Sequence, residues 1–355
     1  MSEIITIKSG LRDYYVDFID NVAEHLEIKF SDNMILMIDQ HVYQIYKSSL
    51  EPATKKYRTV FLAASENNKT IDYSQEIISQ LLLKNVRKSD KLIAIGGGIT
   101  QDIVAFISSI IFRGVSWVFY PTTLLAQGDS CIGSKSSINF KSYKNLVGTF
   151  NPPNHIFIST SFLETLSESE IRSGIGEMMH YFLNNSLEIA KEFMEVHRSF
   201  FNDCSALTPF IRRSLLIKKE IIELDEFDTS IRHIFNYGHT FGHAIEAITN
   251  YAIPHGQAIS IGMNIANFIS LKKEMISRQQ FDEMYDLLKL NMPPFKLNDQ
   301  NIDEYCIALS KDKKNVGNKL GCILTEGAGK MKKCFVDMDQ DFKQTLLAYS
   351  EIYGE

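Results

Sequence analysis

Three histidines within 17 residues are the clearest chemical signal in the sequence. His239 and His243 are four residues apart, so a helix would place both on one face, and His255 follows twelve residues later. An upstream carboxylate, Glu177, lies in a predicted helix. Two histidines and one carboxylate, with coordination positions left open, are typical of a catalytic divalent metal. The spacing predicts a metal site, but it leaves open which two of the three histidines bind.

Glycine is scarce and unevenly placed, and it marks a second candidate site. Thirteen of the 19 glycines lie in residues 96–176 and 238–262. The first window opens with a buried strand, three glycines at 96–98 and the start of a helix near Asp102. Glycines at such a junction let a phosphate approach the backbone, where the N–H groups of the helix N-terminus can bind it. The alternative is a tight turn that binds nothing, with Asp102 as a first-turn acid that the helix dipole favours.

Two further groups of polar residues could bind an anion. Lys135, Lys144 and Asn145 lie in a stretch rich in glycine and serine, where positive charge and exposed N–H groups suit a phosphate. Lys218 and Arg232 lie in a mixed-charge stretch that contains no glycine. A solvated surface is the alternative interpretation for both groups, and an anionic substrate beside the metal would favour binding instead.

The elements that must position these residues change character along the chain. Short apolar runs at 34–38, 59–63, 92–95, 117–120 and 155–158 alternate with helical patterns at 73–85 and 102–112, which predicts a mostly parallel sheet covered by helices. From residue 163 onward, helical segments are predicted at 168–184, 187–200, 205–226, 238–249, 256–274 and 278–290. We therefore expect a Rossmann-like α/β domain at 1–160 and an all-α domain at 161–355, with a few β-like residues around 322–324.

Composition excludes several classes of protein. The net charge of −6 argues against a nucleic-acid surface, and no apolar run reaches the 18 or so residues of a membrane span. The first ten residues lack the apolar core of a secretory signal. Five scattered cysteines without a CxxC pair indicate free thiols in a reducing compartment. We expect a cytoplasmic protein that binds neither nucleic acid nor membrane.

Nine segments, in order, make the chain resemble the 3-dehydroquinate synthase family of sugar-phosphate cyclases. They are GGGITQD (96–102), FRGV (112–115), PTTLLAQGDSCIGSK (121–135), KNLVGTF (144–150), FLETL (162–166), RSGIGE (172–177), NYGHTFGHAIE (236–246), HGQAISIGM (255–263) and DKKNVG (312–317). The resemblance runs from about residue 39 to 314. It implies an NAD-binding α/β domain joined to a helical metal-binding domain, as the pattern of elements predicts.

The resemblance also implies a role for individual residues. Glu177, His239 and His255 match the family's metal ligands, which usually hold zinc, with cobalt as the other candidate ion. Arg232 matches the partner of the substrate carboxylate, and Asp129 and Lys218 match residues around the reacting hydroxyls. Phosphate contacts are implied for Lys135, Asn145, Asn236, His243, one of Lys313 or Lys314, and Arg113, the last supplied by the neighbouring subunit of a homodimer. The NAD positions are Asp39, Glu66, Lys69, Gly97, Gly98, Asp102, Thr122, Thr123, Lys135, Lys144, Phe162 and Thr165.

The activity that the resemblance implies is the conversion of 3-deoxy-arabino-heptulosonate 7-phosphate into 3-dehydroquinate and phosphate. NAD⁺ takes a hydride from a ring carbinol, phosphate leaves by β-elimination, the hydride returns, and an intramolecular aldol step closes the carbocycle. NAD is regenerated in this scheme and is not consumed. The implied partner is thus a phosphorylated sugar acid, and the implied pathway is the shikimate route to aromatic amino acids.

Three positions depart from the family's usual pattern. The lysine three residues after the metal-binding glutamate is His180, a glutamate of the acidic loop is Asp228, and the second glycine before the loop lysine is Ser134. His180 changes both reach and charge near the substrate hydroxyls. Arg232 and Asn236 are kept, whereas 2-deoxy-scyllo-inosose synthases, whose substrate has no carboxylate, typically lose this pair.

Three other functions stay open on the sequence alone. The first is a cyclase that acts on a different ulosonic acid or sugar phosphate, to which His180 and Asp228 are fitted. The second is a glycerol-dehydrogenase-like or iron-dependent alcohol dehydrogenase, which would release NADH and need no phosphate contacts. The third is a binding protein without catalytic activity.

Overall fold

The computed structural model describes residues 4–28, 33–141, 143–312, 314–317 and 319–354. The chain forms two compact units. The first contains the residues up to Leu166 together with Asp203–Phe227, and the second contains Ser167–Asn202 and the chain from Asp228 onward. The units differ from a single division at 160/161 because residues 203–227 return to the first unit.

Within the described residues, seven strands form the sheet of the first unit, in the order β1–β2–β9–β6–β5–β3–β4. Strands β1 and β2 pair antiparallel, and the other neighbours pair parallel. The strands are β1 (Ile5–Ile7), β2 (Tyr14–Phe18), β3 (Met34–Asp39), β4 (Arg58–Leu62), β5 (Lys91–Gly96), β6 (Ser116–Pro121) and β9 (His155–Ile158). The five predicted strands are confirmed to within two residues, while β1 and β2 were not predicted.

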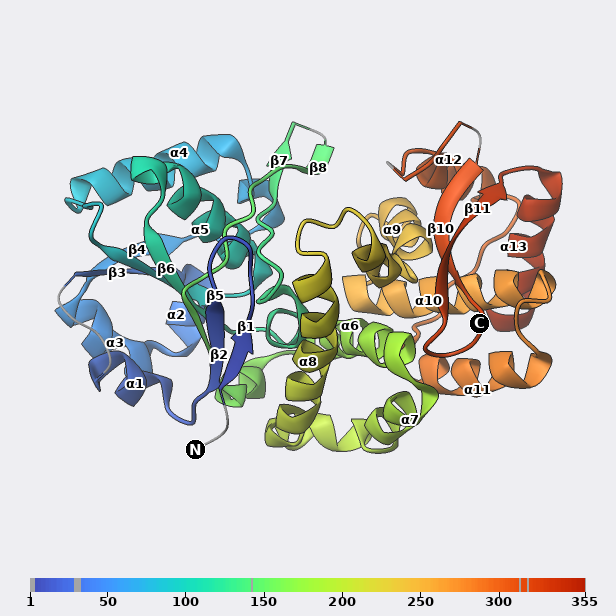
Figure 1. Cartoon of the computed structure of the whole chain (residues 1–355), viewed down its shortest axis with the longest axis horizontal. Helices are drawn as coiled ribbons and strands as arrows, with labels where there is room; N and C mark the ends of the chain where they lie inside the picture. The colour runs from blue at the N-terminus through green and yellow to red at the C-terminus, as the bar shows by residue number, and fades with distance from the viewer. Residues whose placement is uncertain (1–3, 29–32, 142, 313, 318, 355) are drawn as a thin grey trace. The chain divides into compact units, whose positions relative to one another are not determined.

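Alternate residues of each strand point to opposite faces of this sheet, and helices bury both faces. Leu36 and Ile38 of β3 join one core cluster with Leu26 of α1 (Val22–Ile28) and Leu50 of α3 (Lys47–Lys56). The helices α4 (Ile71–Leu83) and α5 (Gly98–Ile110) cover the other side, and α2 (Gln40–Ile45) follows β3 (Figure 1). The predicted parallel α/β architecture is confirmed.

Helix α5 begins four residues before the predicted position. Gly97 has the extended backbone of an N-cap, with φ −83° and ψ −166°, so the helix starts at Gly98. Asp102 consequently lies in the second turn, and the interpretation of this residue as a first-turn acid is wrong. The glycine turn itself is as short as the sequence suggests.

Two more elements complete the first unit. An antiparallel ribbon, β7 (Ile138–Phe140) and β8 (Tyr143–Val147), carries Lys144 and Asn145. Helix α8 (Thr208–Leu224) packs against the π-helical turn Ala126–Ser130, where the Ser214 hydroxyl donates to the carbonyl of Gly128 over 2.7 Å. This contact is one reason why residues 203–227 belong to the first unit.

The described residues of the second unit form helices and one β-hairpin. Its helices are α6 (Glu168–Asn185), α7 (Leu187–Glu195), α9 (His239–Ile248), α10 (His255–Lys272), α11 (Arg278–Leu288), α12 (Ile302–Ser310) and α13 (Gln340–Tyr353). The hairpin β10 (Lys319–Thr325) and β11 (Met331–Asp337) contains the few β-like residues noted in the sequence, and β10 packs against α10 (Figure 1). The expectation of an all-α domain therefore holds except for these two strands. Across the described ranges, no helix is long and apolar enough to span a membrane.

Candidate active site

Two glycines let helices α6 and α10 meet backbone to backbone. A Cβ atom on Gly176 would lie 1.9 Å from the carbonyl oxygen of Gly256, and a Cβ on Gly256 would lie 1.8 Å from that of Ser173. No side chain fits at either position. Each glycine is next to a predicted ligand, so this close approach brings Glu177 on α6 to His255 at the start of α10.

The third predicted ligand is held by another glycine. Gly238 has φ +81° and caps α9, whose first residue is His239. A Cβ on Gly238 would come within 2.8 Å of the carbonyl oxygen of Ile259 in α10, so both the conformation and the space require glycine. Helix α9 thus starts directly against α10.

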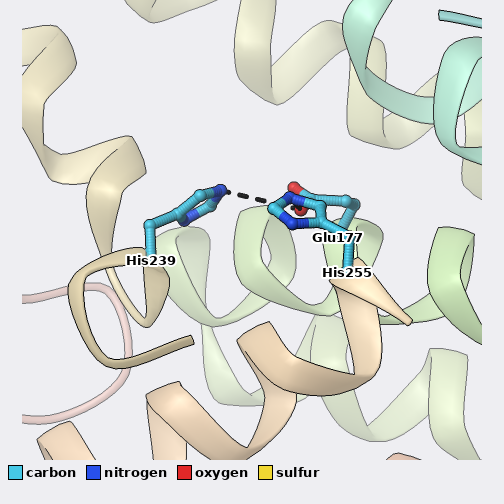
Figure 2. Close-up of side chains that lie close together, drawn as sticks. All are labelled: Glu177, His239 and His255. Atoms are coloured by element: carbon cyan, nitrogen blue, oxygen red, sulfur yellow. Dashed lines mark ion pairs between the residues drawn. The ribbon is translucent and has the colours of Figure 1, made fainter. Parts of the chain in front are cut away.

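The three side chains converge on one point (Figure 2). Glu177 Oε1 lies 2.9 Å from His255 Nε2 and 3.6 Å from His239 Nε2. One ligand atom from each residue lies within 4.8 Å of the others. Glu177 is 2% exposed, so its carboxylate is almost entirely shielded from solvent.

The other nitrogen of each histidine is held by a hydrogen-bond acceptor. His239 Nδ1 lies 3.2 Å from the carbonyl oxygen of Tyr237, and His255 Nδ1 lies 3.0 Å from Glu246 Oε2. An Nδ1–H that donates to such a group leaves the lone pair on Nε2, the atom that faces Glu177. Most metal-binding histidines are oriented in this way.

Electrostatics at this point favour a positive charge. Burial lowers the pKa of His255, but hydrogen bonds to Glu177 and Glu246 outweigh it and raise this pKa to about 10. Burial lowers the pKa of His239 far below its ordinary value and that of His243 to about 4, so both rings are neutral near pH 7. The negative charge of Glu177 and Glu246 that raises the pKa of His255 would equally attract a divalent cation, and a donor set of one carboxylate and two imidazoles suits zinc.

The geometry also separates His239 from His243. His239 faces Glu177, whereas His243 stacks on the His255 ring with centroids 5.6 Å apart. A second group of possible ligands, His243, Glu246 and His255, shares His255 but uses the nitrogen bonded to Glu246. The buried set with Glu177 is therefore the better candidate.

Replacing Glu246 with glutamine tests the hydrogen bond to His255. An amide oxygen accepts Nδ1–H less strongly than a carboxylate does, so we expect the Kd for zinc to rise about 10- to 100-fold. Competition with a chromophoric chelator measures this affinity, and Glu304→Gln on the exposed face of α12 serves as the control. An unchanged zinc affinity in Glu246→Gln would show that Glu246 does not orient the ligand.

Of the other predicted residues of the second unit, His180 lies directly beside a ligand. His180 lies one turn after Glu177, is 1% exposed, and has its ring centroid 5.1 Å from that of His239. Lys314 Nζ donates to Asn236 Oδ1 over 3.3 Å, and both residues line one small pocket. Arg232 is buried, and Asp228 Oδ1 lies 3.5 Å from His233 Nδ1. Lys313 lies outside the described residues.

Most of the predicted cofactor residues of the first unit share one edge of the sheet. Asp39 ends β3, Glu66 follows β4, Gly97 and Gly98 follow β5, Thr122 and Thr123 follow β6, and Phe162 and Thr165 follow β9. In open parallel sheets, ligands bind outside the carboxyl ends of the strands. This placement supports a nucleotide site there.

Specific contacts tie the polar members of this edge together. Lys69 Nζ donates to Asp102 Oδ2 over 2.7 Å, and burial raises the pKa of Asp102 to about 6 although Lys69 opposes the rise. Lys144 Nζ lies 4.0 Å from Glu66 Oε1. The Thr165 hydroxyl lies 2.8 Å from the Tyr46 hydroxyl, and Asp39 accepts the backbone N–H of His41.

The remaining predicted residues of the first unit lie in the turns between strands, on β8 and on α8. Lys218 Nζ donates to Asp129 Oδ1 over 2.7 Å and to its carbonyl oxygen over 2.8 Å. Lys135 and Asn145 are exposed, and Asn145 has φ +54°. Arg113 is exposed with φ +57°, a strained backbone of the kind that clusters at functional sites.

The departure at Ser134 has a structural explanation. Its φ of +66° lies in the left-handed region, which glycine adopts freely and serine does not. The Ser134 hydroxyl donates to Glu226 Oε1 over 2.6 Å, and this carboxylate also accepts from the Ser9 hydroxyl over 2.7 Å. A hydrogen bond that glycine could not make thus offsets the backbone strain.

Sequence reasoning missed two residues that hold predicted site residues in place. Glu246 orients His255, and Asn139 contacts both Glu66 and Asn145. Glu246 follows His243 by three residues on one helix face, which is a weak signal. Nothing in the spacing of Asn139 distinguishes it from other loop asparagines.

Comparisons with known proteins cover nearly the whole chain. The family models described as 3-dehydroquinate synthase N-terminal and C-terminal match residues 59–173 and 174–315. A 3-dehydroquinate synthase of Clostridium tetani is 36% identical over 309 residues, which are 86% of this chain and 83% of the relative.

Two solved structures share the fold. One is a 2-deoxy-scyllo-inosose synthase complexed with carbaglucose-6-phosphate, NAD⁺ and Co²⁺, with a TM-score of 0.84 and 24% identity, covering 98% of this chain and 100% of that one. The other is the 2-epi-5-epi-valiolone synthase of Streptomyces hygroscopicus subsp. jinggangensis 5008 with NAD⁺ and Zn²⁺ bound, with a TM-score of 0.84 and 23% identity, covering 99% and 100%.

Proposed function

This chain belongs to the 3-dehydroquinate synthase family, and from that premise we propose that it converts 3-deoxy-arabino-heptulosonate 7-phosphate into 3-dehydroquinate and phosphate. The observation that carries the proposal is the convergence of Glu177, His239 and His255 from three helices in a chain of this family. We assign them a catalytic divalent metal, with zinc favoured by the donor set.

We assign NAD to the carboxyl edge of the sheet in the first unit. Glu66, Lys69 and Asp102 supply its polar groups, and the turn at Gly97 and Gly98 leaves the N–H groups of α5 for the pyrophosphate. When bound, NAD accepts and returns a hydride, and the metal polarises a substrate hydroxyl as a Lewis acid.

The residues of the chain then bind and orient a substrate that carries two anionic groups. In the second unit, Arg232 is assigned to the carboxylate and Asn236, His243 and Lys314 to the phosphate. In the first unit, Lys135 and Asn145 are assigned to phosphate, and Lys218 holds its proton at Nζ against Asp129, beside the reacting hydroxyls. Arg113, exposed on a strained turn, is assigned to a homodimer partner's phosphate.

A second candidate function has one observation in its favour. His180 is buried with its ring beside that of His239, where the family usually has a lysine. An imidazole there suits a different arrangement of hydroxyls, so a cyclase for another ulosonic acid phosphate is the alternative. Because Arg232 and Asn236 are kept, we favour a substrate with a carboxylate in either case.

One assay separates these functions from each other and from a dehydrogenase. The purified protein is incubated with Zn²⁺, NAD⁺ and 3-deoxy-arabino-heptulosonate 7-phosphate, and released phosphate and NADH absorbance are followed together. We expect phosphate release with no net NADH, because the hydride is returned in each turnover. Stoichiometric NADH would indicate a dehydrogenase, and turnover of only another ulosonic acid phosphate would favour the second candidate.

A further inference from the structure

Asn139 is a buried amide with both of its ends in use. The residue lies in β7 and is 8% exposed. Its Nδ2 donates to Glu66 Oε1 over 2.8 Å and reaches the Glu66 carbonyl oxygen at 3.3 Å. Its Oδ1 accepts the backbone N–H of Asn145 over 2.9 Å. One amide thus joins the segment after β4 to strand β8.

The backbone of Asn139 strengthens this connection. Its N–H donates to the carbonyl oxygen of Lys69 over 2.7 Å, and Thr70 and Asn139 form a parallel β-bridge. Lys144, the residue before Asn145, lies 4.0 Å from the same Glu66 carboxylate. Both strands of the β7–β8 ribbon therefore contact the segment 66–70.

The two ends of the amide depend on each other. An amide that turns its Nδ2 to Glu66 must turn its Oδ1 the other way, and a flip would set donor against donor at Asn145 and acceptor against acceptor at Glu66. Asn145 also has φ +54°, in the left-handed region that asparagine enters more readily than most residues, and the Asn139 amide accepts its N–H there. The orientation of Glu66 and the backbone of Asn145 are thus fixed by one group.

We propose that Asn139 is a positioning residue that couples the nucleotide site to the phosphate-binding strand. This proposal rests on the proposed function for the identity of the two ligands, which are NAD at Glu66 and phosphate at Asn145. A nucleotide that holds the Glu66 carboxylate also holds the amide, and through it the N–H of Asn145. By reciprocity, phosphate bound beside Asn145 strengthens nucleotide binding.

The experiment measures the Kd of NAD⁺ by calorimetry with and without inorganic phosphate. The readout is the Kd measured without phosphate divided by the Kd measured with phosphate. Any direct competition between phosphate and NAD⁺ affects this ratio equally in all variants. We expect Asn139→Ala to lower the ratio about fivefold relative to the unmodified protein, at the lower end of measured couplings between sites. Asn139→Asp keeps the shape and the acceptor but turns a carboxylate to Glu66, and it should lose the coupling as well.

Asn151 provides a matched control in the same unit. Its Nδ2 donates to the Ala105 carbonyl oxygen over 3.0 Å and to the Ser108 hydroxyl over 2.9 Å, and its Oδ1 accepts from Arg12 over 3.2 Å. The Asn151 side chain contacts none of the residues assigned to NAD or phosphate, so Asn151→Ala should lower the melting temperature and leave the ratio unchanged. A purely structural role of Asn139 would give this same result.

Two outcomes overturn the coupling, and they are distinguishable from failure of the proposed function. Equal ratios in the unmodified protein and both Asn139 variants, in a protein that turns over the heptulosonate phosphate, overturn the coupling alone. A protein that neither binds NAD⁺ nor turns over that substrate overturns both. A lowered ratio in Asn139→Asp, with a melting temperature close to that of the unmodified protein, supports the coupling even if Asn139→Ala does not fold.

Discussion

Replacing Glu177 with glutamine should remove bound metal and lower kcat about a thousandfold. The substitution keeps the shape of the side chain but removes the anionic ligand that faces both histidines. A Lewis-acid metal contributes several kcal/mol to the stabilisation of a developing oxyanion, and 1.4 kcal/mol corresponds to a factor of ten in rate. Metal content after dialysis and steady-state kinetics measure the two effects.

The two-unit organisation sharpens this test. The residues assigned to NAD belong to the first unit, so Glu177→Gln should bind NAD⁺ with nearly the affinity of the unmodified protein. Glu195→Gln, an exposed carboxylate at the end of α7, is the matched control and should keep metal, NAD and activity. If Glu177→Gln retained stoichiometric zinc and full activity, the assignment of the metal ligands would be wrong.

Arg232→Ala should weaken turnover of a carboxylate-bearing substrate far more than turnover of one without a carboxylate. Arg232 is 6% exposed, so a carboxylate bound to it is removed from water and must be paired. Truncating one member of a buried charge pair costs about 2–5 kcal/mol, or roughly 30- to several-thousandfold in kcat/KM. Arg232→Lys should recover only part of this loss, since an ammonium cannot form the bidentate pair.

Kinetics on two substrates check this prediction. kcat/KM is compared for the heptulosonate phosphate and for a sugar phosphate without a carboxylate, and Arg198→Ala on the surface is the control. A selective loss on the first substrate supports the carboxylate role. Equal kcat/KM for Arg232→Ala and the unmodified protein on both substrates would contradict it, and with it the preference for an ulosonic acid.

Local patterns in the sequence were sufficient for much of the fold. The sequence predicts β3, β5, β6 and β9 because a continuous apolar run between turn residues is typical of a strand whose parallel sheet is buried on both faces. Helix α5 was predicted four residues late, because the glycines that form its N-cap and first turn disfavour a helix locally. The strands β1 and β2 were missed, because β1 has only three residues and the exposed Tyr15 and the polar Asp17 interrupt the apolar run of β2.

The sequence by itself also determined the kind of chemistry. The donor types at Glu177, His239, His243 and His255, and the motifs around them, point to a metal and a nucleotide without any knowledge of coordinates. Spacing alone left His239 and His243 as alternatives, and the family resemblance implied His239. The tertiary structure brings His239 to Glu177, 62 residues away along the chain, and it alone placed Glu246 on His255. Residues 203–227 and Asn139 likewise acquired their places only in the folded chain. The physical reason is that spacing governs which residues share a helix face, whereas contacts between distant segments depend on how glycines such as Gly176 and Gly256 let whole helices pack.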